Sequence, residues 1–153
     1  MRRERSLRER ALGFLARREH SRAELRRKLS PHAESPEELD ALLEDLVQRK
    51  QLSESRFAEA RARVMSRKFG ATRIERDLRA KGIPEADAVA AASEARATEL
   101  DRAFEIWRRK FGAHAQDLKE RGRQARFLLA RGFSADVINQ ILKHGVKYSD
   151  DSV

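Results

Sequence analysis

Three short stretches of the chain are written almost alike, and they constrain its fold more than any other feature. They read ARREHS from Ala16, SRKFGA from Ser66 and RRKFGA from Arg108, and each carries adjacent basic residues after an apolar segment. Aligning the basic doublets also aligns Lys81-Gly82-Ile83 with Arg131-Gly132-Phe133, provided that the third copy carries an insertion, HAQDLKER, before its middle helix. A unit of about 50 residues that recurs in this way is typical of helical repeats, which cover their apolar faces by stacking on a neighbour. The chain is therefore predicted to contain three tandem copies of one unit.

The residues at the ends of the apolar segments predict helices along the chain. Ser21 begins a capping box with Glu24, Ser35 begins a second, and Thr72 begins a third, in which the hydroxyl accepts from an amide three residues on and the glutamate reaches back. Ala, Leu, Arg and Glu are abundant, while β-branched residues are sparse. We therefore predict an all-α fold of three tandem three-helix repeats that resemble helix-turn-helix units.

These signals also place the boundaries of the repeats. The predicted ranges are 6–52, 53–97 and 98–145 for the three repeats, and 146–153 for a flexible acidic tail. Helical spacing predicts buried stripes within the repeats. The predicted core residues of this kind are Phe57 with Ala60 and Val64, and Phe104 with Trp107 and Phe111.

Charge alternates in register with the repeats. The chain carries a net charge of +9, but this charge is concentrated in three basic blocks of +7, +6 and +6 over residues 1–30, 61–82 and 102–133. The two segments between them, 31–60 and 83–101, carry −5 and −4. Such segmented basic surfaces suit a polyanionic partner, namely nucleic acid, an acidic protein surface or anionic lipid.

The basic residues of the first two helices in each repeat are the candidate partner-binding residues. Cations near a helix C-terminus also stabilise the helix dipole by about 0.3–1 kcal/mol, but that effect does not explain the alternation of charge. Since only Gln124 accompanies the arginines at a spacing suited to reading bases, we expect contacts to phosphate or carboxylate groups. The predicted residues are Arg17, Arg18, Arg67, Lys68, Arg73, Arg76, Arg109, Lys110, Arg123 and Arg126.

Several functional classes are disfavoured by the sequence. It contains no cysteine, and its four histidines stand apart from one another and from carboxylate clusters, so we expect neither disulfides nor a bound metal. No nucleotide-binding loop or hydrolase motif occurs, and we expect a non-enzymatic protein without a cofactor. The basic start MRRERSLRER has no apolar segment behind it, so we do not expect it to be a secretory signal. No apolar run approaches the roughly 20 residues that span a bilayer. A cytoplasmic monomer is the expectation.

Three segments together resemble the RecX family of recombination regulators. They are ALGFLARREHSRAELRRKL, RKFGATRIERDLRAKGI and RFLLARGFSADVINQIL, and they occur in the family's order and spacing over about residues 11–143. Two short segments depart from the family pattern. Ser53-Glu54-Ser55 stands where the family usually has an aspartate pair, and Gly70-Ala71-Thr72 stands where it often has Gly-Gly-Pro.

The resemblance implies a fold and a function. The fold is an elongated, curved array of three tandem three-helix repeats. The function is regulation of RecA: binding to RecA filaments on single-stranded DNA, inhibition of the RecA ATPase and of strand exchange, and so modulation of homologous recombination, DNA repair and the SOS response. The residues leave two alternatives open, a helix-turn-helix protein that binds duplex DNA without RecA, and an interaction array that binds no nucleic acid. They also leave open whether DNA is contacted directly.

Overall fold

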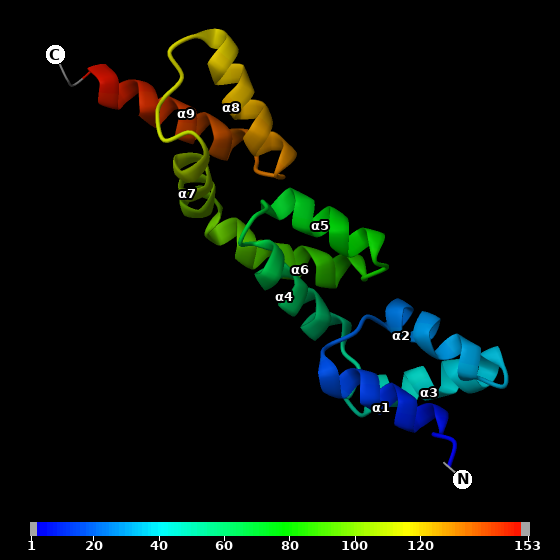
Figure 1. Ribbon diagram of the computed structural model, residues 1–153. Helices are drawn as coiled ribbons and strands as arrows, with labels where there is room; N and C mark the ends of the chain where they lie inside the picture. The colour runs from blue at the N-terminus through cyan, green and yellow to red at the C-terminus, as the bar shows by residue number, and fades with distance from the viewer. Residues whose placement is uncertain (1–2, 151–153) are drawn as a thin grey trace. The chain divides into compact units, whose positions relative to one another are not determined.

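A computed structural model describes residues 3–150 of the chain, and every regular element in that range is helical (Figure 1). The all-α prediction is therefore confirmed. The elements are α1 (Leu7–Arg17), α2 (Arg22–Leu29), the 3-10 turn η1 (Ser30–His32), α3 (Pro36–Gln48), α4 (Glu54–Met65), α5 (Ala71–Ala80), α6 (Glu85–Ala97), α7 (Glu99–Lys110), α8 (Leu118–Ala130) and α9 (Ala135–Asp150).

The helices divide into two compact units. Unit 1 consists of Met1–Arg61 with Leu78–Ala88, and unit 2 consists of Ala62–Asp77 with Val89–Val153. Helices α4, α5 and α6 are each shared between the units, because the division falls within each of them. The predicted tail, 146–153, extends beyond the described residues, and both its flexibility and the predicted repeat boundaries stay predictions.

The core of unit 1 forms where α2 contacts α1 and α3 (Figure 1). Leu25 and Leu29 lie one helical turn apart on α2 and are fully buried beside Leu43 and Leu46 of α3. Ser21 caps α2 as predicted, since its hydroxyl accepts from the amide of Glu24 at 3.0 Å. Ser35 caps α3 in the same way, at 3.1 Å from the amide of Glu38. The carboxylate of Glu24 binds Arg18 rather than reaching back to the cap.

In unit 2, helices α7, α8 and α9 enclose a second core. Trp107 is only 3% exposed, and its indole nitrogen donates to the buried Gln124 side chain at 2.9 Å. The predicted stripe is wrong at Phe104, which is 44% exposed. The buried face of α7 instead runs through Glu99, Ala103 and Trp107 at steps of four residues, and Phe104 lies a quarter turn away from that face. Val64, also predicted to be core, is exposed.

The start of α5 lies very close to the turn between α8 and α9. A Cβ atom at Gly70 would lie 2.3 Å from the carbonyl oxygen of Gly132, and one at Gly132 would lie 2.3 Å from Cβ of Arg73. Gly132 also has a positive φ of +87°, a backbone conformation that glycine adopts more readily than other residues. The amide of Gly70 donates to the carbonyl of Arg131 at 2.8 Å. Two glycines therefore allow repeats 2 and 3 to meet backbone to backbone.

A glutamate at the start of one repeat caps the middle helix of the repeat before it. The amide of Arg22, the first residue of α2, donates to the carboxylate of Glu54, the first residue of α4, at 3.1 Å. The amide of Ala71, which begins α5, donates to Glu99, which begins α7, at 3.0 Å. The capping box predicted at Thr72 is therefore wrong. Gly70 precedes the helix and has no side chain, so a carboxylate distant in sequence supplies the acceptor.

An arginine follows each of these glutamates and binds the ends of the preceding repeat. Arg56 donates to Glu19 at 2.9 Å and to the carbonyl of Lys50 at 2.8 Å, residues that follow α1 and α3. Arg102 donates to carbonyl oxygens that follow α4 and end α6, those of Ser66, Phe69 and Ala95, at 2.6 to 2.7 Å. The two joints between repeats thus share the same contacts. In each, a glutamate accepts from the amide at the start of a helix, and an arginine donates to acceptors at or just after the ends of two helices.

Candidate polyanion-binding site

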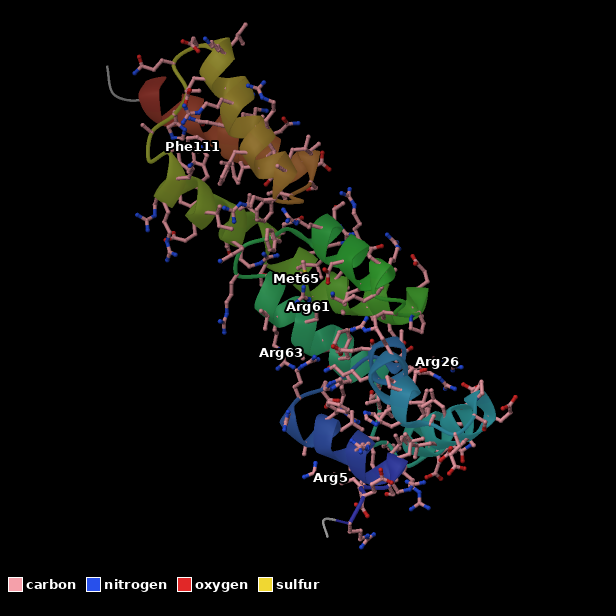
Figure 2. The ribbon with its side chains drawn as sticks, turned by 45° about the vertical axis from the view of Figure 1, so that its right-hand side comes forward. Arg5, Arg26, Arg61, Arg63, Met65 and Phe111 are labelled. Carbon is pink, nitrogen blue, oxygen red and sulfur yellow. The ribbon has the colours of Figure 1, made fainter. Side chains whose placement is uncertain are left out.

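All ten cations predicted to bind a partner are exposed. Arg17 and Arg18 belong to unit 1, and the other eight belong to unit 2. Figure 2 shows side chains that end in nitrogen along both units, including the labelled Arg5, which precedes α1, and Arg26 of α2. Exposure alone does not make these cations equivalent, because their local partners differ.

The doublet of repeat 1 is partly neutralised by an acid within the same repeat. The guanidinium of Arg18 donates to both carboxylate oxygens of Glu24, at 2.9 and 2.6 Å, and this bidentate contact lowers the pKa of Glu24 to about 2. Arg18 also donates to the carbonyl of Glu19 at 3.0 Å. Arg17 forms no ion pair with any described side chain. Of the two arginines, only Arg17 keeps all its donors for a partner.

A buried histidine follows the doublet of repeat 1. His20 is 1% exposed, and its Nε2 lies 2.9 Å from Nζ of Lys28. Since an ammonium group can only donate, Nε2 accepts, and the ring proton sits on Nδ1, 3.1 Å from the carbonyl oxygen of Arg18. Burial lowers the pKa of His20. Nζ of Lys28 also lies 5.0 Å from the ring centroid of Phe14. Lys28 therefore has two partners within repeat 1, the rings of His20 and Phe14.

Several cations of unit 2 lie against aromatic rings. The guanidinium of Arg73 lies 3.9 Å from the ring centroid of Phe69. Arg131 lies 5.8 Å from Phe69 and 5.0 Å from Phe127, between the two rings. Arg73 also donates to the carbonyl of Ala130 at 3.1 Å. Two guanidinium groups and two rings therefore alternate across the place where repeats 2 and 3 meet.

The series continues toward the end of α7. Nζ of Lys110 lies 5.6 Å from the centroid of Phe127, and the rings of Phe127 and Phe111 meet edge to face at 5.4 Å. Arg123 lies 5.5 Å from Phe111, which is labelled in Figure 2. We name these seven residues the cation–aromatic strip. Its members are Arg73, Phe69, Arg131, Phe127, Lys110, Phe111 and Arg123.

The strip contains three of the predicted residues and four that were not predicted to bind. Arg73, Lys110 and Arg123 were predicted, whereas Arg131 and the three phenylalanines were not. A signal for the rings was present, because phenylalanine follows the basic doublets of repeats 2 and 3 where Glu19 follows that of repeat 1. Among the remaining predicted residues, Arg109 lies 3.3 Å from Glu105. Arg67, Lys68, Arg76 and Arg126 form no ion pair within the described part of the chain.

Other kinds of site find little support in the described residues. No group of three or more histidine, aspartate and glutamate side chains there could hold a metal ion. A cleft in unit 1 has nearly balanced charge, since Arg22, Lys50 and Arg56 line it together with Glu54 and Asp87. Within residues 3–150, each helix is too short or too polar to cross a bilayer.

Comparison with known proteins gives matches along most of the chain. Models of the first, second and third three-helix domains of RecX match residues 8–46, 53–91 and 97–142. Regulatory protein RecX of Leptothrix cholodnii is 49% identical over 138 residues, 90% of this chain and 88% of the relative. Regulatory protein RecX of Ralstonia nicotianae is 42% identical over 146 residues, 95% of this chain and 92% of the relative.

A solved structure supports the same fold. The crystal structure of RecX from Lactobacillus salivarius superposes with a TM-score of 0.79, covering 92% of this chain and 95% of that one. At 19% sequence identity, this likeness concerns the arrangement of the helices alone. Together with the three domain matches, it confirms the prediction of three consecutive three-helix domains.

Proposed function

The chain belongs to the RecX family of regulatory proteins, and from this premise we propose that it binds RecA filaments on single-stranded DNA and inhibits them. The inhibited activities are ATP hydrolysis and strand exchange, so the protein modulates homologous recombination, DNA repair and the SOS response. The observation that carries the proposal is the match to all three RecX domains, in order, between residues 8 and 142.

The exposed cations suggest how binding is achieved. A filament presents the same acidic and phosphate groups again and again along its length, and the chain presents basic faces that recur with its own repeats. Joining weak contacts on one scaffold raises avidity by about 10²–10⁴ when the spacings match. We assign this binding to the ten predicted cations, from Arg17 to Arg126. The protein acts as a monomeric, non-enzymatic regulator in the cytoplasm.

The first test is the single-strand-dependent ATPase of RecA at physiological salt. The chain is added at concentrations well below that of RecA, and we expect inhibition because each bound molecule affects many subunits of one filament. Absence of inhibition together with retained binding to duplex DNA would contradict the proposal and favour a helix-turn-helix protein that works without RecA.

The multivalent mechanism has its own test in the same assay. Charge reversal in two repeats should raise the concentration needed for half inhibition by far more than the sum of the two single effects. The matched variants are Arg17→Glu, Arg126→Glu and the double variant, because both positions are exposed and unpaired among the described residues. If the single effects merely combine, or if a single repeat inhibits as well as the whole chain, the multivalent mechanism is wrong.

A further inference from the structure

We propose that the cation–aromatic strip is a composite site, built jointly by repeats 2 and 3, that grips the phosphates of a single-stranded nucleic acid directly. This inference rests on the proposed function for its setting and deepens it, because it names DNA itself as a group that the bound chain touches. It also assigns the direct contact to unit 2 rather than equally to all three basic blocks.

The geometry leaves the right donors available. In the strip, the rings approach the guanidinium groups of Arg73 and Arg131 closely enough for cation–π attraction. A guanidinium that stacks through its face keeps N–H donors at its edge, and those donors match the oxygens of a phosphate. The rings and the carbonyls of Lys68 and Ala130 hold both side chains in place before a ligand arrives, so little side-chain freedom is lost on binding.

The charge of the strip favours nucleic acid over an acidic protein. Arg73, Arg131 and Lys110 form no ion pair among the described residues, and Arg123 has only the distant Glu120 at 3.8 Å. The cations of the strip are thus almost uninterrupted by acids. A chain of phosphates is likewise of one sign, whereas protein surfaces mix both signs.

The rings favour a single strand over a duplex. Phe69, Phe111 and Phe127 are half-buried, so each presents part of an apolar ring between cations. Proteins that bind single strands combine basic grooves with aromatic side chains against which unstacked bases pack. Bases inside a duplex are stacked on each other and cannot use such rings.

The strip exists only where two repeats are joined. Phe69 follows the first helix of repeat 2, while Phe127 belongs to the middle helix of repeat 3. The close approach of Gly70 to Gly132 brings the two rings to either side of Arg131. Neither repeat alone contains the site, which explains why aligning the repeats with one another did not reveal it.

The test measures binding of a fluorescent oligothymidine to the full chain without RecA, by anisotropy over a range of salt concentrations. Two variants preserve charge and disturb only the strip: Phe69→Leu removes a ring, and Arg131→Lys replaces a planar cation by a point charge. We expect each to weaken binding about tenfold, because Phe69→Leu loses one base–ring contact and Arg131→Lys loses the planar set of donors to a phosphate. The control Arg27→Gln removes an exposed, unpaired charge from unit 1, and we expect a loss of less than about twofold.

Several outcomes would overturn the inference. Equal losses for Arg27→Gln and Arg131→Lys, or no loss for Phe69→Leu, would show that diffuse charge alone attracts the oligonucleotide. Tighter binding to a duplex of the same length would contradict the preference for a single strand. Thermal unfolding by circular dichroism checks that each variant folds, and Arg73→Lys, at an exposed position, replaces Phe69→Leu if that variant does not.

The inference and the proposed function fail in different ways. A chain that inhibits RecA but does not bind the oligonucleotide alone would refute the strip as a nucleic-acid site and leave the proposed function standing. A chain that binds the oligonucleotide through the strip but does not inhibit RecA would refute the proposed function and leave the strip standing as a nucleic-acid site. If Phe69→Leu impaired inhibition of RecA without affecting the oligonucleotide, the strip would face protein, and the inference would be wrong.

Discussion

The basic doublets of unit 1 and unit 2 are nearly the same in sequence, yet the structure uses them differently. Arg18 binds Glu24 with both ends of its guanidinium, and a buried histidine follows. Lys110 instead lies against Phe127, beside Phe111, and has no acid partner among the described residues. The comparison teaches that the partner supplied by the fold decides whether a cation stays available to a ligand: the carboxylate of Glu24 neutralises Arg18, whereas the ring of Phe127 leaves the charge of Lys110 unpaired within the described residues.

The largest expected effect comes from reversing charge in the strip. Arg131→Glu with Lys110→Glu places two negative charges beside Phe127, and we expect about hundredfold weaker oligothymidine binding, since each change removes a charged contact and adds repulsion. The matched reversal in unit 1 is Arg17→Glu with Arg27→Glu, for which we expect a loss of about threefold or less. Anisotropy at a fixed salt concentration measures both. Equal losses would break the comparison between the units.

The two joints should differ in their contribution to stability. Glu99 is 4% exposed and is the side-chain acceptor for the start of α5, so Glu99→Ala should lower the free energy of unfolding by about 1–3 kcal/mol. Glu54 is half-buried, and α2 also has its own Ser21 cap, so Glu54→Ala should cost about 1 kcal/mol or less. Urea denaturation measures the difference. A larger loss for Glu54→Ala would contradict this account.

Acid should weaken unit 1 through His20. Burial lowers the pKa of His20 in the folded chain below its ordinary 6.5, so between these two pKa values the unfolded chain binds more protons and stability falls as the pH falls. The backbone carbonyl of Arg18 and the carboxylate of Glu24 favour its protonation, whereas the positive charges of Arg18 and Lys28 oppose it. His20→Asn should flatten the dependence just below pH 6.5 in thermal unfolding, since the residue no longer titrates.

A control for the pH effect exists in unit 2. His114 stacks on Trp107 at 4.7 Å and its pKa is also lowered by burial, but it is only half-buried. His114→Asn should therefore flatten the dependence of stability on pH less than His20→Asn.

Below pH 4.5 a further loss of folding stability is expected from Glu24. Its pKa is about 2 in the folded chain, so the unfolded chain binds the proton first as the pH falls.

The smallest expected effects come from two single arginine variants, one of which should change only the free energy of unfolding and the other only oligonucleotide binding. Arg18→Gln breaks the bidentate contact with Glu24, and we expect a loss of about 1 kcal/mol in the free energy of unfolding without a change in oligonucleotide binding. Arg131→Lys should show the opposite pattern, with weaker binding at nearly unchanged stability. The comparison fails if Arg18→Gln weakens binding as much as Arg131→Lys does.

Local patterns predicted most of the fold, because local forces determine it. Ser21 and Ser35 cap helices through amides three residues away, and such contacts can be read from the sequence. The capping box predicted at Thr72 is wrong because the acceptor for the amide of Ala71 is Glu99, 28 residues further along the chain. Phe104 was misplaced because its helix turns a glutamate and an alanine toward the core beside Trp107, which apolar spacing does not indicate.

The candidate site was harder to predict, because it depends on contacts between repeats. Arg131 looks like the last residue of a helix before a glycine, which is a common place for a cation. Its position between Phe69 and Phe127 follows from the meeting of Gly70 with Gly132, 62 residues apart in the numbering. Pairing across such a distance leaves no periodic signal in a single sequence.

The glutamates that begin α4 and α7 also have a consequence for folding during synthesis on the ribosome. The acceptor for the first amide of α2 is Glu54, and that for α5 is Glu99, so each repeat emerges unfinished and is completed by the residues synthesised next. Nascent domains generally fold from the N-terminus onward, and here one amide at the start of α2 and one at the start of α5 gain their acceptor only when the next repeat is synthesised. The series ends at α8, whose start is capped by its own Asp117. A chain truncated after α6 would thus lack the carboxylate that accepts from the first amide of α5.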